Sequence, residues 1–266
     1  MKIGFYKSNQ SYSENLRDTD PRRHQSLPSL CASQEFYAKY SGRLSAGCTA
    51  GQALLDVGCG VGQVVRALQE QGLRAHGIDV SETSIEIARK SSEACQVYDG
   101  QRIPFPDGNF QAVGAFNVLE HVEDPIAFLD EAGRVLAPGG RMIISSPNFL
   151  RVLGWKDYHP HMRGIGRKWK NLRAILARRD RYSAEKEAVI FEKMIPIVRP
   201  NPMPDDDATV VTNSFDLQRY FQVRGYGQIK VSCVDRPVPR LIEWGLDATP
   251  LRFLVLNSFV EAIKAP

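Results

Sequence analysis

Apolar residues between positions 53 and 147 follow two alternating patterns. Short runs of consecutive apolar residues, such as residues 53–58 (ALLDVG), are typical of strands that are buried on both faces. Between these runs, apolar residues recur every three or four positions, which is typical of helices with one face on a core. Strand and helix alternate five times. The pattern predicts an α/β fold with a doubly wound, mostly parallel sheet and helices on both of its faces.

The same spacing assigns the individual elements of this region. The predicted strands are residues 53–58, 74–80, 95–99, 110–116 and 141–146. The predicted helices begin at residue 63, after Ser81 as an N-cap, and at residue 125. Residues 137–140 (APGG) predict a turn before the fifth strand.

The rhythm breaks after residue 147 and resumes near residue 214. Residues 148–213 are basic and then proline-rich, so we interpret them as an insertion that is helical at 169–179 and 184–194. A capped helix (214–225), a strand (228–234), a helix or loop from 251 and an antiparallel last strand near 259–265 then complete the sheet. The chain therefore divides into a helical lead-in (1–50), the core (51–147), the insertion (148–213) and the completion of the sheet (214–266).

Residues 33–43 form the clearest helical segment of the lead-in. Phe36, Tyr37 and Tyr40 lie on one face of this predicted helix. These aromatic side chains either pack on the core or form a lid over a ligand, and the sequence does not decide between the two.

Composition excludes several classes of protein. The chain has 266 residues, of which 43% are hydrophobic and 24% charged, which is typical of a soluble domain. No apolar run has the roughly 18 residues that a membrane span needs, and residues 1–20 lack a signal-peptide pattern. The five scattered cysteines form no CxxC pair and no zinc-like cluster with histidine. We therefore expect a cytoplasmic protein without a structural metal.

A glycine-rich segment follows the first predicted strand. Gly58, Gly60 and Gly62 stand at alternate positions between that strand and a helix, where the backbone can approach a ligand closely. A dinucleotide site would have the spacing GxGxxG, but Gln63 occupies the place of its third glycine. This spacing favours a ligand without a pyrophosphate, and Asp56 within the strand would suit an ammonium group.

A carboxylate ends the second predicted strand, 17 residues after the glycine-rich segment. Asp79 can accept two hydrogen bonds from a ribose 2′,3′-diol, as carboxylates do at the same place in dinucleotide folds. An acidic strand end alone is a weak signal. Together with the glycine spacing it becomes specific for a nucleoside ligand.

Four segments, in order, resemble the blocks of the class I S-adenosylmethionine (SAM)-dependent methyltransferases. They are LLDVGCGVGQ, GIDVS, VYDGQRIPFPDGNFQAVGAFNVLEHVEDP and RVLAPGGRMIIS, and they span residues 54–146. The resemblance is strongest to the branch of ubiquinone and small-molecule methyltransferases. It implies a Rossmann-like fold with SAM as cofactor and S-adenosylhomocysteine as product. Gln111 departs from the family pattern, which often has Asp there, at a position that is usually structural.

The resemblance also implies roles for single residues. Gly58 and Gly60 would line the methionine moiety of SAM, with Asp56 near its amino group. Asp79 would hold the ribose. The remaining implied cofactor contacts are Asp99 and Gly100 at the adenine and Asn117 and Val118 beneath the sulfonium. Val80 and Tyr37 are further candidates for cofactor binding, and Tyr37 belongs to the possible lid.

The sulfonium is already activated, so methyl transfer depends mostly on alignment of acceptor, methyl and sulfur. An oxygen acceptor must also lose a proton. His121 follows the fourth predicted strand at the carboxyl edge of the sheet, where ligands bind in such folds. It is our candidate base; the alternative is a structural or cofactor-proximal role.

The insertion carries the candidate acceptor contacts. Residues 151–186 contain eleven Lys or Arg against three Asp or Glu, a local charge of +8 compared with +4 for the whole chain. This indicates a solvated helix face, an anionic acceptor or a peripheral contact with a membrane surface. His159, His161, Trp155 and Arg163 are candidate substrate residues, and their alternative is a role as ordinary loop residues.

We expect O-methylation of a small molecule or a sugar in glycan or natural-product biosynthesis, with the insertion as a cap over the acceptor. The alternatives are a C- or N-methyltransferase of a quinone-like or amine acceptor, an RNA methyltransferase and a non-catalytic SAM-binding protein. Nucleic acid is disfavoured because no Asn/Asp-Pro-Pro-Tyr/Phe signature follows the fourth strand. The sequence leaves the oligomeric state open.

Overall fold

A seven-stranded sheet forms the centre of the computed structural model, which describes residues 34–154, 157–199, 203–235 and 237–266. The strand order is β3-β2-β1-β4-β5-β7-β6, and β7 is antiparallel to both of its neighbours. The strands are β1 (Ala53–Val57), β2 (Arg74–Asp79), β3 (Cys95–Val97), β4 (Phe110–Phe116), β5 (Leu136–Pro147), β6 (Gly227–Ser232) and β7 (Asn257–Ile263). The predicted α/β class, the parallel core and the antiparallel last strand are confirmed.

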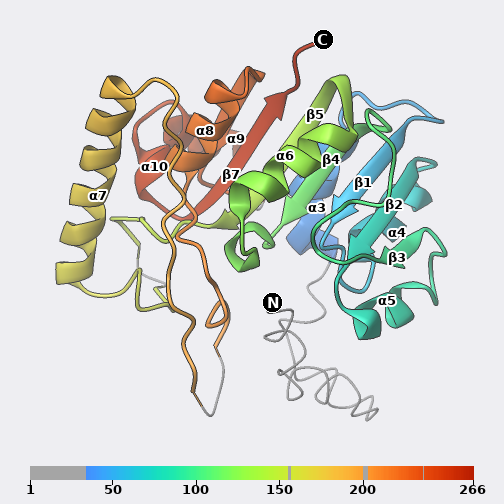
Figure 1. Ribbon diagram of the computed structural model, residues 1–266, viewed down its shortest axis with the longest axis horizontal. Coiled ribbons are helices and arrows are strands. Elements are labelled where there is room, and N and C mark those ends of the chain that lie inside the picture. Colours follow the sequence, from blue (N-terminus) through green and yellow to red (C-terminus); the bar gives the residue numbers. More distant parts are fainter. Residues whose placement is uncertain (1–33, 155–156, 200–202, 236) are drawn as a thin grey trace.

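Helices cover both faces of the sheet (Figure 1). They are α3 (Gln34–Ser45), α4 (Gln63–Glu70), α5 (Glu82–Ala88), the 3-10 helix η1 (Leu119–His121), α6 (Pro125–Val135), α7 (Ile165–Ala184), α8 (Ser214–Val223), α9 (Arg240–Asp247) and α10 (Leu251–Leu254). Apolar residues of α6 and α8 form one core with the sheet, and those of α3, α4 and α5 form a core on the opposite face. None of the helices in the described ranges is long and apolar enough to cross a membrane.

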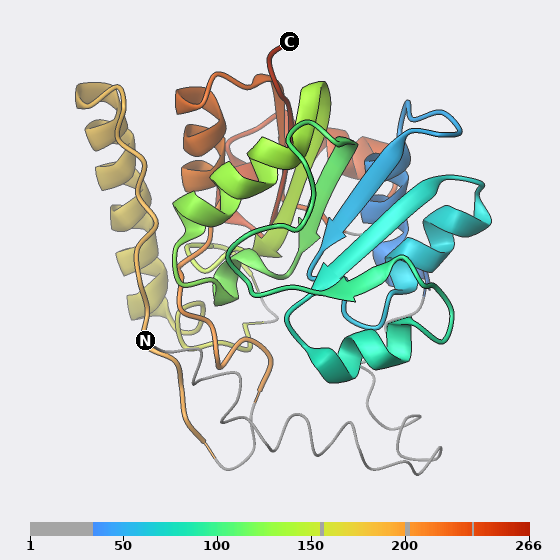
Figure 2. The same ribbon diagram turned by 45° about the vertical axis from the view of Figure 1, so that its right-hand side comes forward.

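The parallel strands all end at one edge of the sheet (Figure 2). Val57 pairs with Ile78, and Phe116 pairs with Ser145, so the ends of β1, β2, β4 and β5 lie beside each other. The residues that follow these strands therefore meet at this edge, which is where ligands bind in open α/β sheets. The lead-in helix α3 is tied to the sheet by Arg43, which makes a two-pronged ion pair with Glu261 at 2.7 Å.

Most strands begin or end one or two residues away from the predicted bounds, and two of the differences have a clear structural cause. Residues 137–140 do not form a separate turn, because β5 already pairs with β4 at Leu136, and the register shifts before it resumes at Arg141. Gly139 has φ +71° in this irregular stretch, and its N–H donates to the carbonyl of Lys264 at 3.1 Å. β3 ends two residues earlier than predicted. One carboxylate oxygen of Asp99 accepts the backbone N–H groups of Gln101 and Arg102, so the chain turns there instead of continuing the strand.

The predicted helix at residues 184–194 is wrong. α7 ends at Ala184, and the chain beyond it becomes extended and pairs with the segment that returns toward α8. The N–H of Met194 donates to the carbonyl of Thr209, and the N–H of Val211 donates to that of Glu192, each at 2.8 Å. Pairing with a segment that is distant along the chain therefore replaces the helix that local spacing favours. Helix α9 was not predicted.

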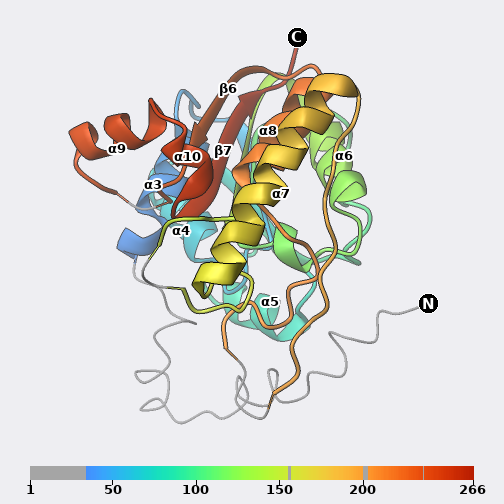
Figure 3. The same cartoon turned by 90° about the vertical axis from the view of Figure 1, so that its left-hand side faces the viewer.

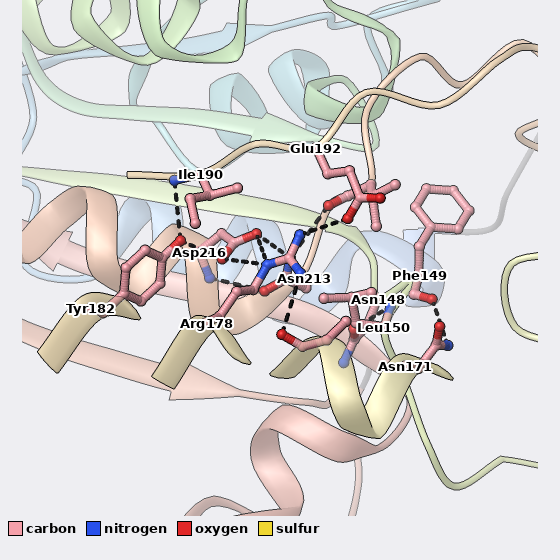
Figure 4. A network of polar contacts seen from close by, with 12 residues as sticks. Asn148, Phe149, Leu150, Asn171, Arg178, Tyr182, Ile190, Glu192, Asn213 and Asp216 are labelled. Carbon is pink, nitrogen blue, oxygen red and sulfur yellow. Dashed lines mark hydrogen bonds and ion pairs between the residues drawn. The ribbon is translucent and has the colours of Figure 1, made fainter. Parts of the chain in front are cut away.

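A buried polar network fixes α7 against the start of α8 (Figures 3 and 4). The guanidinium Nε of Arg178 donates to both carboxylate oxygens of Asp216, at 3.0 and 3.1 Å. Asp216 also accepts the hydroxyl of Tyr182 at 2.6 Å and the side-chain amide of Asn213 at 2.7 Å. The N-terminal loop of the insertion is held from the same helix by Asn171, whose amide donates to three backbone carbonyls. α7 is thus positioned by specific buried polar contacts.

Candidate functional site

The glycine-rich loop after β1 combines close packing with open space. Gly58, Gly60 and Gly62 all have positive φ, at +75°, +52° and +78°, a region that favours glycine. A Cβ added to Gly58 would lie 2.2 Å from Cγ2 of Val118, whereas one added to Gly60 would meet nothing within 4 Å. The loop is therefore pressed against Val118 at one point and leaves room at the next, where a ligand can approach the backbone.

Asp79 connects the end of β2 to this loop. Its carboxylate accepts the N–H of Gly60 at 2.9 Å and the N–H of Ser81 at 2.8 Å, one on each oxygen. Burial raises the pKa of Asp79, and these backbone donors act in the opposite direction. Each carboxylate oxygen retains a second lone pair, which matches the predicted pair of hydrogen bonds from a ribose diol.

Apolar surface and a second carboxylate lie beyond Asp79. Val80 and Val97 are each 39% exposed at the carboxyl edge of β2 and β3. A Cβ added to Gly100 would come within 3.2 Å of Val80. Asp99 is an exposed residue whose pKa is lowered by the backbone N–H groups that it accepts. Exposed apolar side chains near a carboxylate are compatible with the adenine that the resemblance assigns to Asp99 and Gly100.

Asp56 lies inside the fold and contacts the lead-in helix. The hydroxyl of Tyr40 donates to its carboxylate at 2.7 Å, and burial raises the pKa of Asp56 to about 7. Gly114 makes room for this contact, because a Cβ there would lie 2.2 Å from the Tyr40 hydroxyl. The implied role of Asp56 toward the SAM amino group stays a prediction.

The aromatic face of α3 continues to the edge of the sheet. Tyr40 is fully buried, whereas Tyr37 is half-buried with its ring 5.3 Å from that of Phe116 in an edge-to-face arrangement. Phe116 is the last residue of β4 and precedes Asn117, which has φ +55° and donates its N–H to Ser145 at 2.8 Å. Tyr37 is therefore placed close to the strand end that the resemblance assigns to the cofactor.

His121 ends the short helix η1 that follows β4. Its side chain is 18% exposed, and Nδ1 lies 3.3 Å from a carboxylate oxygen of Asp207. Nε2 lies 3.8 Å from a carboxylate oxygen of Glu120. His121 therefore stands at the carboxyl edge of the sheet between two carboxylates, and one of them comes from the insertion.

Glu120 and Asp205 were not predicted as site residues. The Glu120 side chain is fully buried, and within the described ranges neither of its carboxylate oxygens has a hydrogen-bond partner. Asp205 accepts the hydroxyl of Tyr158. Burial raises the pKa of both carboxyl groups, and each of the two also lies near other carboxylates. The sequence motif LEHV contains Glu120, so Glu120 could have been singled out. Asp205 is distant along the chain, and no local sequence pattern predicts that it lies near Glu120.

The predicted substrate residues of the insertion have different surroundings. His159 is buried 4.9 Å from the ring of Phe149, and burial together with the neighbouring His161 lowers its pKa to about 4. Its Nδ1 accepts the backbone N–H of His161 at 3.2 Å, so His159 is neutral in this arrangement. Arg163 is exposed. Trp155 lies outside the described residues.

Part of the basic charge of the insertion is used internally. Arg178 pairs with Asp216, and Arg151 and Lys168 both pair with Asp157, at 2.8 and 2.7 Å. Other basic residues of α7, such as Lys170 and Arg173, are exposed. An anionic acceptor or surface would therefore meet fewer cations than the sequence count suggests.

Comparison with known proteins bears directly on this site. Residues 55–144 match the family model described as "Methyltransferase domain". Over 103 residues the chain is 38% identical to the demethylmenaquinone methyltransferase of Tropheryma whipplei (37% of this chain, 43% of that protein). Over 136 residues it is 33% identical to the ubiquinone biosynthesis O-methyltransferase of Idiomarina loihiensis (43% of this chain, 56% of that protein). The chain thus spans about half the length of these relatives.

The fold extends the likeness beyond the matched residues. A SAM-dependent methyltransferase of Thermotoga maritima, described as a possible histamine N-methyltransferase, superposes with a TM-score of 0.55 at 15% identity. The superposition covers 91% of this chain and 95% of that one, and it shows a shared fold. Residues 55–144 therefore match a methyltransferase domain, as the four sequence blocks predict, and the chain shares its Rossmann-like fold with this SAM-dependent methyltransferase.

Proposed function

We propose that the protein transfers the methyl group of SAM to an oxygen of a small-molecule acceptor, with His121 as the group that receives the acceptor proton. The observation that carries this proposal is the place of His121. Its imidazole stands directly after β4 at the edge that holds the glycine-rich loop, and Asp207 lies 3.3 Å from Nδ1. Nδ1 forms no hydrogen bond within the described residues, so a small rotation of either side chain would let this carboxylate orient the imidazole.

The reaction needs little else from the chain. The acceptor oxygen attacks the methyl carbon, the carbon–sulfur bond breaks, and S-adenosylhomocysteine is the leaving product. The loop at Gly58 and Gly60 and the carboxylate of Asp79 would hold the cofactor at the edge of the sheet that η1 also follows. Holding the two reactants in line supplies most of the acceleration, and proton removal contributes about 10²- to 10⁴-fold more.

The names of the relatives support one class of acceptor. Two of them act, by their names, in the biosynthesis of menaquinone and ubiquinone, and one of those is an O-methyltransferase. A hydroxylated quinone-like ring is therefore the first acceptor to test, and sugars in glycan or natural-product biosynthesis are the second. The C- or N-methyl transfer alternatives would not need His121 as a base in the same way. A cytoplasmic location stays a prediction from the sequence.

The experiment combines calorimetric SAM binding with transfer of labelled methyl to a panel of hydroxylated quinones, sugars and amines. His121→Ala should reduce turnover about 10²-fold or more with SAM affinity nearly unchanged. His76→Ala is the matched control, because His76 is half-buried within β2 and belongs to no part of the proposed site. Loss of SAM binding in His121→Ala would indicate a cofactor or folding role. SAM binding without any turnover of the panel would support the non-catalytic alternative.

A further inference from the structure

Three side chains from two distant segments converge beside the methyl-transfer edge. Glu120 and His121 belong to η1, and Asp205 comes from the insertion. Each offers one ligand atom, and the three atoms lie within 4.8 Å of one another. Donor atoms that surround one metal ion are typically about 3 to 3.5 Å apart, so small side-chain rotations would bring this group to a coordinating geometry.

The buried carboxylate of Glu120 is the strongest sign of a missing partner. It is fully buried, and its two oxygens have no hydrogen-bond partner within the described part of the chain. Burial of an unpaired charge costs several kcal/mol, and buried polar groups in native proteins are normally satisfied. The nearest ring nitrogen, Nε2 of His121, is 3.8 Å away and too distant to satisfy it.

Other carboxylates lie near Glu120, His121 and Asp205, and few cations are available to neutralise them. Asp205 accepts the neutral hydroxyl of Tyr158, and Asp207 adds a further carboxylate beside His121. The nearby cations are engaged elsewhere: Lys193 donates to the carbonyl of Glu123, and Arg199 pairs with Asp206. Among the described residues, no Lys or Arg forms an ion pair with Glu120 or Asp205. The cluster therefore attracts a cation from solution.

We propose that Glu120, His121 and Asp205 bind one divalent metal cation. Two carboxylate oxygens and one imidazole nitrogen form a donor set that suits Zn²⁺ and Mn²⁺. Three protein ligands leave at least one coordination position for water or for an acceptor oxygen. The interaction between Tyr158 and Asp205 orients one ligand from outside, as contacts to metal ligands commonly do.

The position of the site gives the ion a role in the reaction. Glu120 follows Val118 by two residues, and Val118 packs against the loop at Gly58. A hydroxyl group coordinated to the ion would release its proton to water more readily, and the resulting oxygen would attack the SAM methyl carbon. His121 would then act as a ligand in place of a base. This consequence rests on the proposed transfer to oxygen and replaces the base role of His121 in it, whereas binding of the ion depends on neither.

The test uses the full chain, treated with chelator and desalted, and titrates it with Mn²⁺ or Zn²⁺. Calorimetry and the electron paramagnetic resonance signal of free Mn²⁺ should show one ion bound per chain. Glu120→Gln and Asp205→Asn should each weaken binding at least tenfold. Glu123→Gln is the matched control: it removes an exposed carboxylate three residues from Glu120, and its affinity should equal that of the wild type. Absence of binding up to millimolar ion, or equal binding in Glu120→Gln and Asp205→Asn, would overturn the proposal.

Thermal unfolding separates loss of the site from loss of the fold. Mn²⁺ should raise the melting temperature of the wild type, because an ion that binds only the folded state stabilises it. Glu120→Gln removes a buried unpaired carboxylate, so its metal-free melting temperature should match or exceed that of the wild type and should not respond to Mn²⁺. If Glu120→Gln does not fold, the same measurement is made with Asp205→Asn, which changes a loop residue. Its melting temperature should also not rise when Mn²⁺ is added.

Methyl transfer by chelated protein distinguishes this inference from the proposed function. Ion binding that depends on Glu120 and Asp205, in a chain that methylates no acceptor, would contradict the proposed function and leave the metal site standing. Methyl transfer in a chain that binds no ion would contradict the metal site and leave His121 as the base.

Discussion

Replacement of Gly58 by alanine tests how tightly the cofactor loop packs on the segment after β4. The new Cβ would lie 2.2 Å from Cγ2 of Val118, well inside van der Waals contact, at a residue with φ +75°. Overpacking of this kind costs about 1–3 kcal/mol, and the left-handed backbone adds about 1–2 kcal/mol for a residue with a Cβ. We expect Gly58→Ala to lower the free energy of unfolding by about 2–5 kcal/mol.

Gly60→Ala is the matched comparison. It shares the positive φ, at +52°, but its Cβ would meet nothing within 4 Å. Its cost in stability should therefore be the backbone contribution alone, about 1–2 kcal/mol. Its effect on SAM should be larger than its effect on stability, because the methyl group would project into the space that we assign to the methionine moiety.

Urea unfolding and SAM calorimetry are compared for five proteins: the wild type, Gly58→Ala, Gly60→Ala, Val118→Ala and the variant that combines Gly58→Ala with Val118→Ala. Val118→Ala removes the atom that clashes, so Gly58→Ala combined with Val118→Ala should recover about 1–3 kcal/mol relative to the sum of the single changes. Additivity of the two changes within about 0.5 kcal/mol would show that the contact does not constrain the loop. Wild-type SAM affinity in Gly60→Ala would refute the placement of the cofactor over Gly60.

Three further outcomes are expected. Asp79→Ala should weaken SAM binding about 10²- to 10⁴-fold by calorimetry, since two hydrogen bonds to a carboxylate contribute about 1.5–3 kcal/mol each; an unchanged Kd would exclude Asp79 from the pocket. Burial raises the pKa of Asp56 from 3.8 to about 7, so the folded state retains a proton that the unfolded chain loses, and stability should fall as pH rises through this window. Asp56→Asn should flatten that slope in urea titrations, and an identical slope would contradict the pKa. Arg178→Met leaves Asp216 buried without its cation and should cost about 3–5 kcal/mol, whereas Arg173→Met on the exposed face should change stability by less than about 0.5 kcal/mol; equal effects would disprove the anchoring role of Arg178.

Local signals were sufficient for the core and for the cofactor segment. The buried strands could be predicted from the sequence because both faces of a parallel strand are covered. Such a strand therefore consists of consecutive apolar residues, as in β1. The loop at Gly58 was readable because a positive φ and a close approach both require glycine. Asp79 was readable because β2 ends at the same edge as β1 in any such sheet.

Predictions failed where distant pairing competed with local preference. Residues 184–194 have helical spacing, but the N–H groups of Met194 and Val211 find partners in the opposing segment. Residues 137–140 have turn chemistry, yet β5 continues through them, because Leu136 and Arg141 on either side pair with β4 and the backbone of Lys264 bonds to Gly139 and Gly140. Neither partner is visible within a local window of sequence.

The sequence by itself determined the fold class, the glycine-rich turn after β1 and the positions of Asp79 and His121 at the edge of the sheet, whereas their roles toward SAM stay predictions. Only the tertiary structure decided what surrounds His121. Asp205 and Asp207 reach it from the insertion, and Glu120 becomes a buried carboxylate only because the insertion covers η1. Local spacing encodes which atoms are available, but burial and charge depend on contacts between segments far apart in the chain, and those contacts form only when the chain folds.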